Sequence, residues 1–245
     1  MRDAELEQLV KALGLTRIAV VYRDLVRRAQ EEKWPHRRLL GELFSEEEAF
    51  RRSRALELRI RRANIPDGWS LDTFPFHRQP GVSRAQIEEL AELDWILKAI
   101  NLIFIGHPGV GKTGLASSLL LKALFDGRTG MSYKAQDMLD ELHRSIADRR
   151  TRFLMNRLAR LDVLLIDEMG YLNLNTDQTN LFFKLMDTRY RAKRPTLITT
   201  NLGYDEWGAH LKNPPMVEAL LSRLKQRCIT IEIEGPDLRN SQDQA

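Results

Sequence analysis

Residues 106–113 read Gly-His-Pro-Gly-Val-Gly-Lys-Thr, the spacing G-x-x-x-x-G-K-[ST] that cradles phosphate groups. The glycines let backbone N–H groups approach phosphate oxygens, Lys112 would contact the β- and γ-phosphates, and the Thr113 hydroxyl would ligate Mg²⁺. The apolar run 102–105 predicts a buried strand before this loop, and 115–124 predicts a helix after it, so a chance glycine-rich turn is the poorer explanation. We therefore predict a site for ATP and Mg²⁺. Its loop residues would be Gly106, His107, Pro108, Gly109, Val110, Gly111, Lys112, Thr113 and Gly114.

A second group of polar residues follows two further apolar runs. The run 163–166 is succeeded by Asp167 and Glu168, and the run 195–200 by Asn201. Ligands bind at the carboxyl ends of strands in open α/β sheets, so we expect these side chains to meet the phosphate loop. Asp167 would hold Mg²⁺, mostly through water, and Glu168 would orient and deprotonate the attacking water. Asn201 would sense the γ-phosphate or help to hold that water, although asparagine at a strand end is also a frequent turn former.

The elements that position these residues alternate between strands and helices. Strand-like runs lie at 102–105, 129–133, 163–166, 195–200 and 229–233, and helical periodicity separates them. Residues 1–62 are helical throughout, and their third helix is expected to begin near Ser45, with Glu48 completing a capping box. The predicted organisation is a helical N-terminal domain at 1–62, a linker at 63–85, a nucleotide-binding domain at 86–239 and a disordered tail at 240–245. In the linker, Trp69, Phe74 and Phe76 are expected to anchor the chain onto the following domain, some of them near the nucleotide base.

Composition places limits on the kind of protein. The chain has 245 residues, a formal net charge of +4 and a pI near 9.3, which permits nucleic-acid binding without requiring it. Its single cysteine, Cys228, allows neither an internal disulfide nor a cysteine-based zinc site. No apolar run reaches the length of a membrane span, and the N-terminus lacks a secretory signal. We expect a cytoplasmic protein with no membrane partner.

Arginines gather in two helical stretches. The first, at 51–62, includes Arg51, Arg52 and Arg54, and it is either a solvated helix face balanced by neighbouring glutamates or a stripe that binds phosphate groups or a protein partner. The second follows the second predicted strand, and there we expect DNA contact rather than a solvated helix pair. Its candidate DNA-binding residues are Lys134, Arg144, Arg149, Arg150 and Arg152.

Together these motifs resemble the IstB-like ATP-binding proteins, AAA+ ATPases that assist the transposases of bacterial insertion sequences. The resemblance rests on Gly-x-x-x-x-Gly-Lys-Thr, Leu-Leu-Ile-Asp-Glu-Met-Gly-Tyr-Leu, Leu-Ile-Thr-Thr-Asn-Leu and Glu-Trp-Gly, and it covers essentially the whole chain. It implies an α/β fold: an AAA+ P-loop NTPase αβα domain with a five-stranded parallel sheet, preceded by the small helical domain. Such proteins are also similar to DnaC-type loaders of the replicative helicase.

The resemblance further implies partners and two arginine roles. Arg223 would complete a neighbouring subunit's site in trans, with Arg194 and Arg227 as rivals, and Arg239 would contact the nucleotide in cis. Leu238 departs from the aromatic residue that commonly precedes that second arginine. The expected partners are duplex DNA without sequence preference, a cognate transposase, and further copies of the chain in a ring or helical oligomer. A loader that binds single-stranded DNA and a nucleotide-gated scaffold with little hydrolysis are the alternatives.

Overall fold

The structure is a computed structural model that describes residues 3–66, 70–172, 174–210 and 214–239. The chain forms two compact units, Met1–Leu58 and Arg59–Ala245. The division falls inside one long helix, α3 (His36–Ala63). The predicted tail at 240–245 and the linker residue Trp69 lie outside the described residues.

The first unit is helical, as the sequence predicts. It contains α1 (Asp3–Ala12), α2 (Thr16–Glu31) and the first part of α3, packed around Val10, Ile18 and Tyr22. The expected helix start near Ser45 is wrong, because α3 already begins at His36 and Ser45 lies within it. Pro35 does interrupt the preceding helix, but its carbonyl accepts from Arg38 N–H at 2.8 Å and thus opens the next one.

A buried carboxylate caps α2 from another helix. Glu47, on α3, is only 3% exposed, and its Oε2 accepts the backbone N–H groups of Arg17 at 2.8 Å and Ile18 at 3.1 Å. The helix has no side-chain cap from its own N-terminal residue, so Glu47 satisfies donors that would otherwise lack a partner. Burial alone would raise the pKa of Glu47, but the two backbone N–H groups and Arg51 outweigh it and hold the pKa below 4.5.

Glu47→Gln is expected to lower the free energy of unfolding of the first unit by about 1–2 kcal/mol at neutral pH, the usual range for losing a cap or a charged hydrogen bond. Because the folded pKa is the lower one, the stabilisation is complete above pH 4.5 and disappears as the pH falls through the folded value. Hydrogen exchange of the amides of Arg17 and Ile18, measured across this pH range, reports the change locally. Glu48→Gln is the control, since Glu48 forms an exposed ion pair with Arg52. An equal effect of the two substitutions would contradict the capping role.

The second unit contains the predicted five-stranded sheet. Its order is β2-β3-β4-β1-β5, and every neighbouring pair is parallel. The strands are β1 (Asn101–Gly106), β2 (Gly130–Lys134), β3 (Val163–Asp167), β4 (Thr196–Thr200) and β5 (Cys228–Ile233). The fold class expected from the sequence is confirmed.

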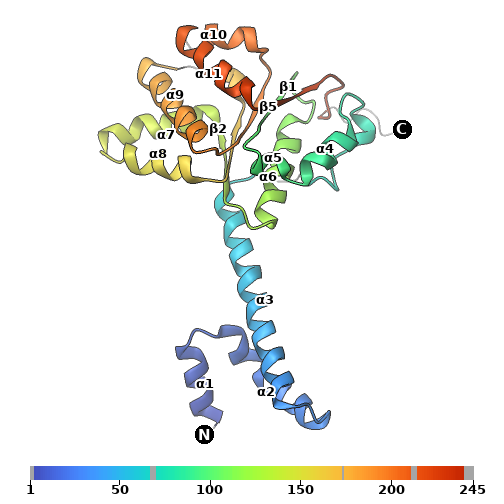
Figure 1. Ribbon diagram of the computed structural model, residues 1–245. Coiled ribbons are helices and arrows are strands. Elements are labelled where there is room, and N and C mark those ends of the chain that lie inside the picture. Colours follow the sequence, from blue (N-terminus) through green and yellow to red (C-terminus); the bar gives the residue numbers. More distant parts are fainter. Residues whose placement is uncertain (1–2, 67–69, 173, 211–213, 240–245) are drawn as a thin grey trace. The chain divides into compact units, whose positions relative to one another are not determined.

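Two helical layers cover the sheet because successive strand residues point to opposite faces (Figure 1). Ile103, Leu164 and Ile198 pack beneath one layer, and Leu102, Leu165 and Leu197 pack beneath the other. The first layer consists of α7 (Ala135–Ala147), α8 (Thr151–Arg160), α9 (Thr176–Arg191) and α11 (Pro214–Gln226). The second consists of α4 (Arg84–Ala91), α5 (Asp94–Leu97) and α6 (Lys112–Phe125). Short helices complete the unit: η1 (Phe76–Arg78), η2 (Met169–Tyr171), η3 (Tyr204–Glu206) and α10 (Trp207–His210). Within the described residues, no helix combines the length and apolar character needed to span a membrane.

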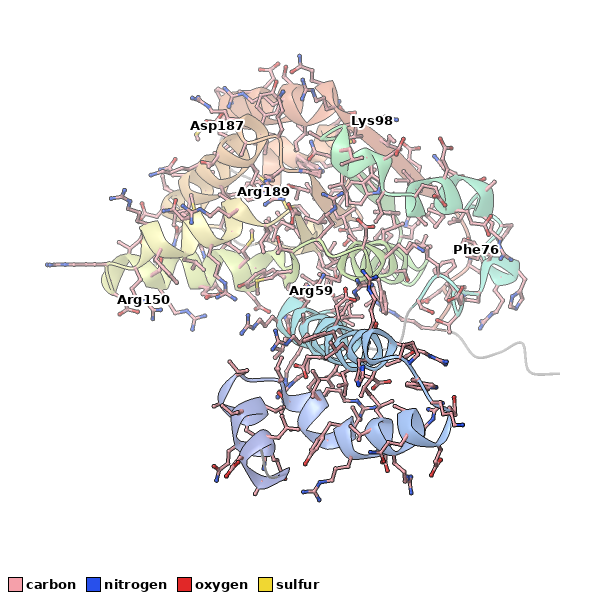
Figure 2. The ribbon with its side chains drawn as sticks, turned by 60° about the horizontal axis from the view of Figure 1, so that its bottom comes forward. Arg59, Phe76, Lys98, Arg150, Asp187 and Arg189 are labelled. Carbon is pink, nitrogen blue, oxygen red and sulfur yellow. The ribbon has the colours of Figure 1, made fainter. Side chains whose placement is uncertain are left out.

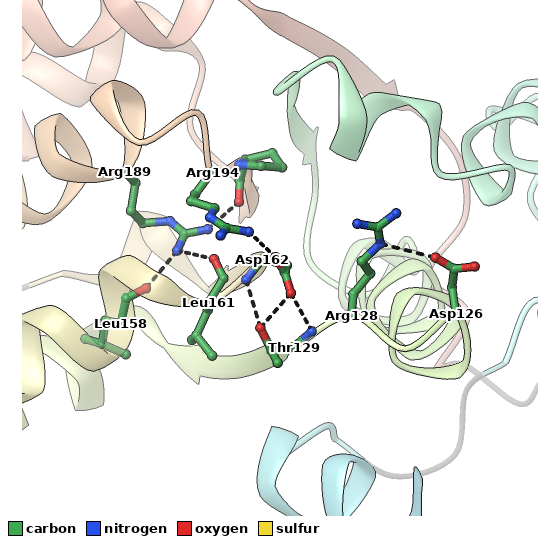
Figure 3. A network of polar contacts seen from close by, with 9 residues as sticks. Asp126, Arg128, Thr129, Leu158, Leu161, Asp162, Arg189 and Arg194 are labelled. Atoms are coloured by element: carbon green, nitrogen blue, oxygen red, sulfur yellow. Dashed lines mark hydrogen bonds and ion pairs between the residues drawn. The ribbon is translucent and has the colours of Figure 1, made fainter. Parts of the chain in front are cut away.

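Arg189 is buried inside the first layer, a position that the helical pattern of 177–191 does not predict. It is 1% exposed and donates to the carbonyls of Leu158 at 2.7 Å, Leu161 at 3.0 Å and Pro195 (Figure 3). Burial lowers the pKa of this guanidinium to about 9, with Arg194 adding to the effect. Its bonds join α9 to the end of α8 and to the start of β4.

Candidate nucleotide site

The predicted loop and the strand-end residues converge on one cleft at the carboxyl ends of β1, β3 and β4. The cleft has a volume of about 440 Å³. Its lining consists of Pro108, Gly109, Gly111, Lys112, Thr113, Gly114, Glu168, Thr199, Thr200, Asn201, Leu238 and Arg239. Gly106, His107, Val110 and Asp167 do not line it, although each belongs to the loop or the strand end beside it.

Two loop glycines are required by both conformation and space. Gly109 has φ +83° and Gly111 has φ +95°, values that favour glycine. A Cβ on Gly109 would lie 1.9 Å from an oxygen of Asp237, and one on Gly111 would lie 2.8 Å from the Phe74 ring. The loop then enters α6 at Lys112, so the N-terminus of this helix faces the cleft.

Lys112 folds over the loop that carries it. Its Nζ donates to the carbonyls of Gly106 at 2.8 Å and His107 at 2.7 Å. Burial lowers the pKa of Lys112; the charge of Asp167 opposes this shift and that of Arg239 adds to it. Lys112 and Arg239 line the same cleft.

Asp167 is held by hydroxyl groups from two sides. Its Oδ1 accepts from Thr113 Oγ1 at 2.8 Å and from Thr199 Oγ1. The carboxylate is 3% exposed, which fixes its position behind the loop. A hydroxyl and a carboxylate in contact are the hard oxygen donors that Mg²⁺ prefers, so the residues present fit the predicted ion. Thr199 is a member of this group that the sequence analysis missed; its place at the end of a buried strand was the available signal.

Glu168 and Asn201 both face the cleft. Glu168 adopts a left-handed conformation with φ +60°, uncommon for a residue with a side chain and typical of functional sites, and its N–H donates to Thr199 Oγ1 at 3.0 Å. Asn201 Oδ1 is buried and has no hydrogen-bond partner among the described residues. It lies against Gly170, where a Cβ would approach this oxygen to 1.7 Å.

Lys134 contacts the predicted base rather than solvent alone. It ends β2, next to β3, and its Nζ lies 3.1 Å from Glu168 Oε2 and 3.3 Å from Oε1. The hydrogen bond and the charge of Glu168 raise the pKa of Lys134. A residue that we expected to contact DNA therefore pairs with the predicted base, a link that sequence spacing does not reveal.

The linker and the C-terminal segment enclose the loop. Phe74 is 4% exposed, belongs to the core under α6 and abuts Gly111. Gln79 Nε2 donates to Val110 O at 3.0 Å, and Leu238 N–H donates to Gly109 O at 2.9 Å. The linker aromatics Phe74 and Phe76 pack edge to face at 4.8 Å between ring centroids. Gln79 was not anticipated, because a lone polar residue in a proline-rich linker carries no signal.

The four arginines considered for nucleotide contact lie in different environments. Arg239 lines the cleft, whereas Arg223 does not and instead pairs with Asp187 at 2.6 Å on the surface. Arg194 pairs with Asp162, beside the amino end of β3 (Figure 3). The backbone carbonyl of Arg227 accepts from Asn101 N–H at 2.8 Å, at the amino end of β1.

The two basic stretches differ in how their charges are balanced. In α3, Arg51 and Arg52 pair with glutamates at 2.8 Å and 2.6 Å, and Arg54 stacks 5.8 Å from the Phe50 ring centroid. Around the turn between α7 and α8, Arg149, Arg150 and Arg152 form no ion pair within the described part of the chain. The guanidinium groups of this turn, which includes Arg150 (Figure 2), are therefore not held in ion pairs with any described residue, although Asp148 lies in the same turn. Among the residues that the structure describes, Arg144 donates to the backbone carbonyl of Asp140 alone, at 3.3 Å.

With this geometry in view, comparison with known proteins identifies the family. The model of the IstB-like ATP binding proteins matches residues 8–245. The chain belongs to this family. An IstB-like relative, an ATP-binding protein of insertion sequence IS21 from Pseudomonas aeruginosa, is 31% identical over 96% of this chain and 88% of its own length. Another, of insertion sequence IS5376 from Geobacillus stearothermophilus, is 30% identical over 82% of this chain and 79% of its own.

Solved structures share the fold of the second unit. The DnaC helicase loader superposes with a TM-score of 0.57 at 22% identity, over 67% of this chain and 96% of its own. AMPPCP-bound DnaA from Aquifex aeolicus gives a TM-score of 0.58 at 20% identity, over 71% of this chain and 53% of its own. At these identities the likeness shows a common AAA+ fold, as the sequence predicted.

Proposed function

We propose that this IstB-like protein is a Mg²⁺-dependent ATPase that assembles on duplex DNA and assists the transposase of an insertion sequence. The observation that carries the ATPase is the convergence of Lys112, Thr113 and Glu168 on one cleft, with Asp167 directly behind it. The Lys112 ammonium and the loop N–H groups neutralise the phosphates. Thr113 and Asp167 would hold the ion, which would supply charge neutralisation at the phosphates.

Glu168 accepts the proton of the attacking water in this mechanism, and Asn201 helps to place that water. Both side chains line the cleft, and Thr199 fixes the backbone of Glu168 through its hydroxyl. Lys134 shares its charge with Glu168 in the free subunit, so hydrolysis is faster once this ion pair is weakened. A ligand that draws Lys134 away, such as a DNA phosphate, would activate the base.

The position of the arginines supports self-assembly. Among the described residues, Lys112 and Arg239 are the basic side chains that line the cleft. Arg223 lies outside it, so its contribution as a transition-state arginine requires a neighbouring copy. The insertion-sequence names of the relatives support a transposase as the partner that the assembly recruits.

The experiment that tests this function is ATP turnover with and without duplex DNA, together with assembly size. Stimulation by duplex of unrelated sequences and ATP-dependent growth of the assembly are expected, followed by co-purification of the cognate transposase. Stimulation by single strands alone would instead indicate a helicase loader. Assembly on DNA without ATP turnover would indicate a nucleotide-gated scaffold that does not hydrolyse ATP.

The turn between α7 and α8 is expected to supply the DNA contacts. Arg150→Gln with Arg152→Gln should weaken duplex binding equally for unrelated sequences and should lower the slope of log affinity against log salt by about 2, one unit for each lost phosphate contact. Arg52→Gln with Arg54→Gln is the control of equal charge, and little change is expected because Arg52 is already paired. A larger effect of the control pair would indicate that α3, and not the turn between α7 and α8, contacts the DNA.

A further inference from the structure

Asp187 connects two arginines on the surface of the second unit. Its Oδ1 lies 2.6 Å from Arg223 Nη1, and its Oδ2 lies 2.8 Å from Arg191 Nε. Arg191 is one turn further along α9, whereas Arg223 comes from α11. Asp187 lies at the surface of α9, while Arg189, two residues on, is enclosed (Figure 2). One carboxylate therefore has each of its oxygens assigned to a different guanidinium group.

The two ion pairs give the carboxylate a defined orientation. Arg191 contacts Oδ2, and Oδ1 is directed to α11. The two helices are packed together, with Phe183 of α9 and Leu220 of α11 lining the groove between them. The distance between the backbones that carry Asp187 and Arg223 is consequently set by the core.

The pairing leaves much of the guanidinium available. Arg223 engages Asp187 through Nη1, and its side chain is 46% exposed. An arginine carries five N–H donors in a planar fork, so Nε and Nη2 retain donors for a phosphate group. An arginine held in this way has lost much of its rotamer freedom and still presents free donors.

We propose that Asp187 is a positioning residue for Arg223: it holds the guanidinium in the orientation in which a neighbouring copy's γ-phosphate receives it. This inference rests on the proposed trans role of Arg223. An exposed ion pair adds little to folding stability, which leaves pre-organisation as the use of this contact. The benefit is entropic: when two subunits meet, the Arg223 side chain is already ordered and does not lose further rotamer freedom.

A mixing experiment isolates the donor side of the subunit interface. The Arg223→Ala protein keeps a cleft but supplies no arginine, and the Lys112→Ala protein supplies the arginine but has no functional cleft. In their mixture, a complete active site forms only where Arg223 of the Lys112→Ala protein reaches the cleft of the Arg223→Ala protein. Replacing the second protein by Lys112→Ala/Asp187→Asn changes only the subunit that supplies Arg223, which we call the donor subunit. ATP turnover of the mixture with duplex DNA is then measured at fixed stoichiometry, with the assembly size recorded for both mixtures.

The expected result is a fall in kcat of roughly tenfold to a hundredfold, because a misplaced Arg223 guanidinium stabilises the transition state less well. KM for ATP should be unchanged, because the cleft that binds ATP is intact. Asp187→Glu in the same donor should restore part of the rate, and Glu88→Gln, which breaks an exposed pair with Arg84, should leave it unchanged. Equal or higher turnover with the Asp187→Asn donor would overturn the inference while preserving the trans role of Arg223. Failure of the first mixture to turn over ATP would overturn that trans role, and the role of Asp187 with it.

Discussion

Glu168→Gln is expected to lower ATP turnover by roughly 10²–10⁴-fold, the usual contribution of a positioned general base. The substitution keeps the size and hydrogen-bonding reach of the side chain but removes its ability to take a proton. The backbone N–H bond to Thr199 and the left-handed conformation do not depend on the carboxylate, so the strand end should keep its structure. ATP affinity should be retained, and ATP-bound assemblies should accumulate. Single-turnover hydrolysis and equilibrium binding of labelled ATP separate these two effects.

The ion pair between Glu168 and Lys134 requires its own control. Glu168→Gln also removes the charge that faces Lys134, at 3.1 Å. Lys134→Gln breaks the same pair and leaves the carboxylate in place, so its basal turnover should stay equal or rise. If Lys134→Gln reproduced the loss seen with Glu168→Gln, the ion pair and not the base would be responsible. Normal turnover of Glu168→Gln would remove Glu168 as the base.

Lys112→Ala is expected to weaken ATP binding by at least roughly a hundredfold. Two charge-assisted contacts, to the β- and γ-phosphates, are lost, and each is usually worth about 1.5–3 kcal/mol. The substitution also removes the Nζ group that donates to the carbonyls of Gly106 and His107, so the nucleotide-free loop loses two hydrogen bonds. Calorimetric titration with a non-hydrolysable ATP analogue and Mg²⁺ measures the affinity directly.

The matched control for this change is Lys122→Ala. Lys122 lies on the same helix, α6, and its side chain is exposed at the far end from the loop. The Lys122→Ala substitution removes one positive charge from α6 without changing the cleft, so the affinity for ATP is expected to be unchanged. Tight ATP binding by Lys112→Ala would refute the assignment of the phosphate loop.

Local pattern was sufficient to predict the sheet, its parallel connections and the loop that precedes α6. β1 and β3 contain short apolar runs, β5 alternates between apolar and polar residues, and the predicted site residues lie at or just after strand ends, so spacing along the chain carries this information. The start of α3 was placed near Ser45 on the evidence of a capping-box pattern, whereas the helix begins directly after Pro35, and proline suits the beginning of a helix. Helix periodicity marks which positions are apolar, and it cannot indicate that an arginine such as Arg189 belongs inside.

The contacts that tune the site are the part that the sequence did not reveal. Lys134 and Glu168 are 34 residues apart, and Arg223 and Asp187 are 36 residues apart. Both pairs exist because neighbouring strands or packed helices bring them together, and no repeat or spacing records that. The same holds for Gln79, whose contact with Val110 depends on the path of the linker across the loop.

Arg189 has a mechanical consequence for the second unit. Its guanidinium is bonded to the end of α8, to the residue before β4 and, at 3.0 Å, to Thr196 at the start of that strand. Backbone carbonyls bound in this way cannot slide past one another without stranding a buried charge. We therefore expect the C-terminal end of α8, the helix that follows the α7–α8 turn, to move together with the start of β4, the strand that ends beside Asn201.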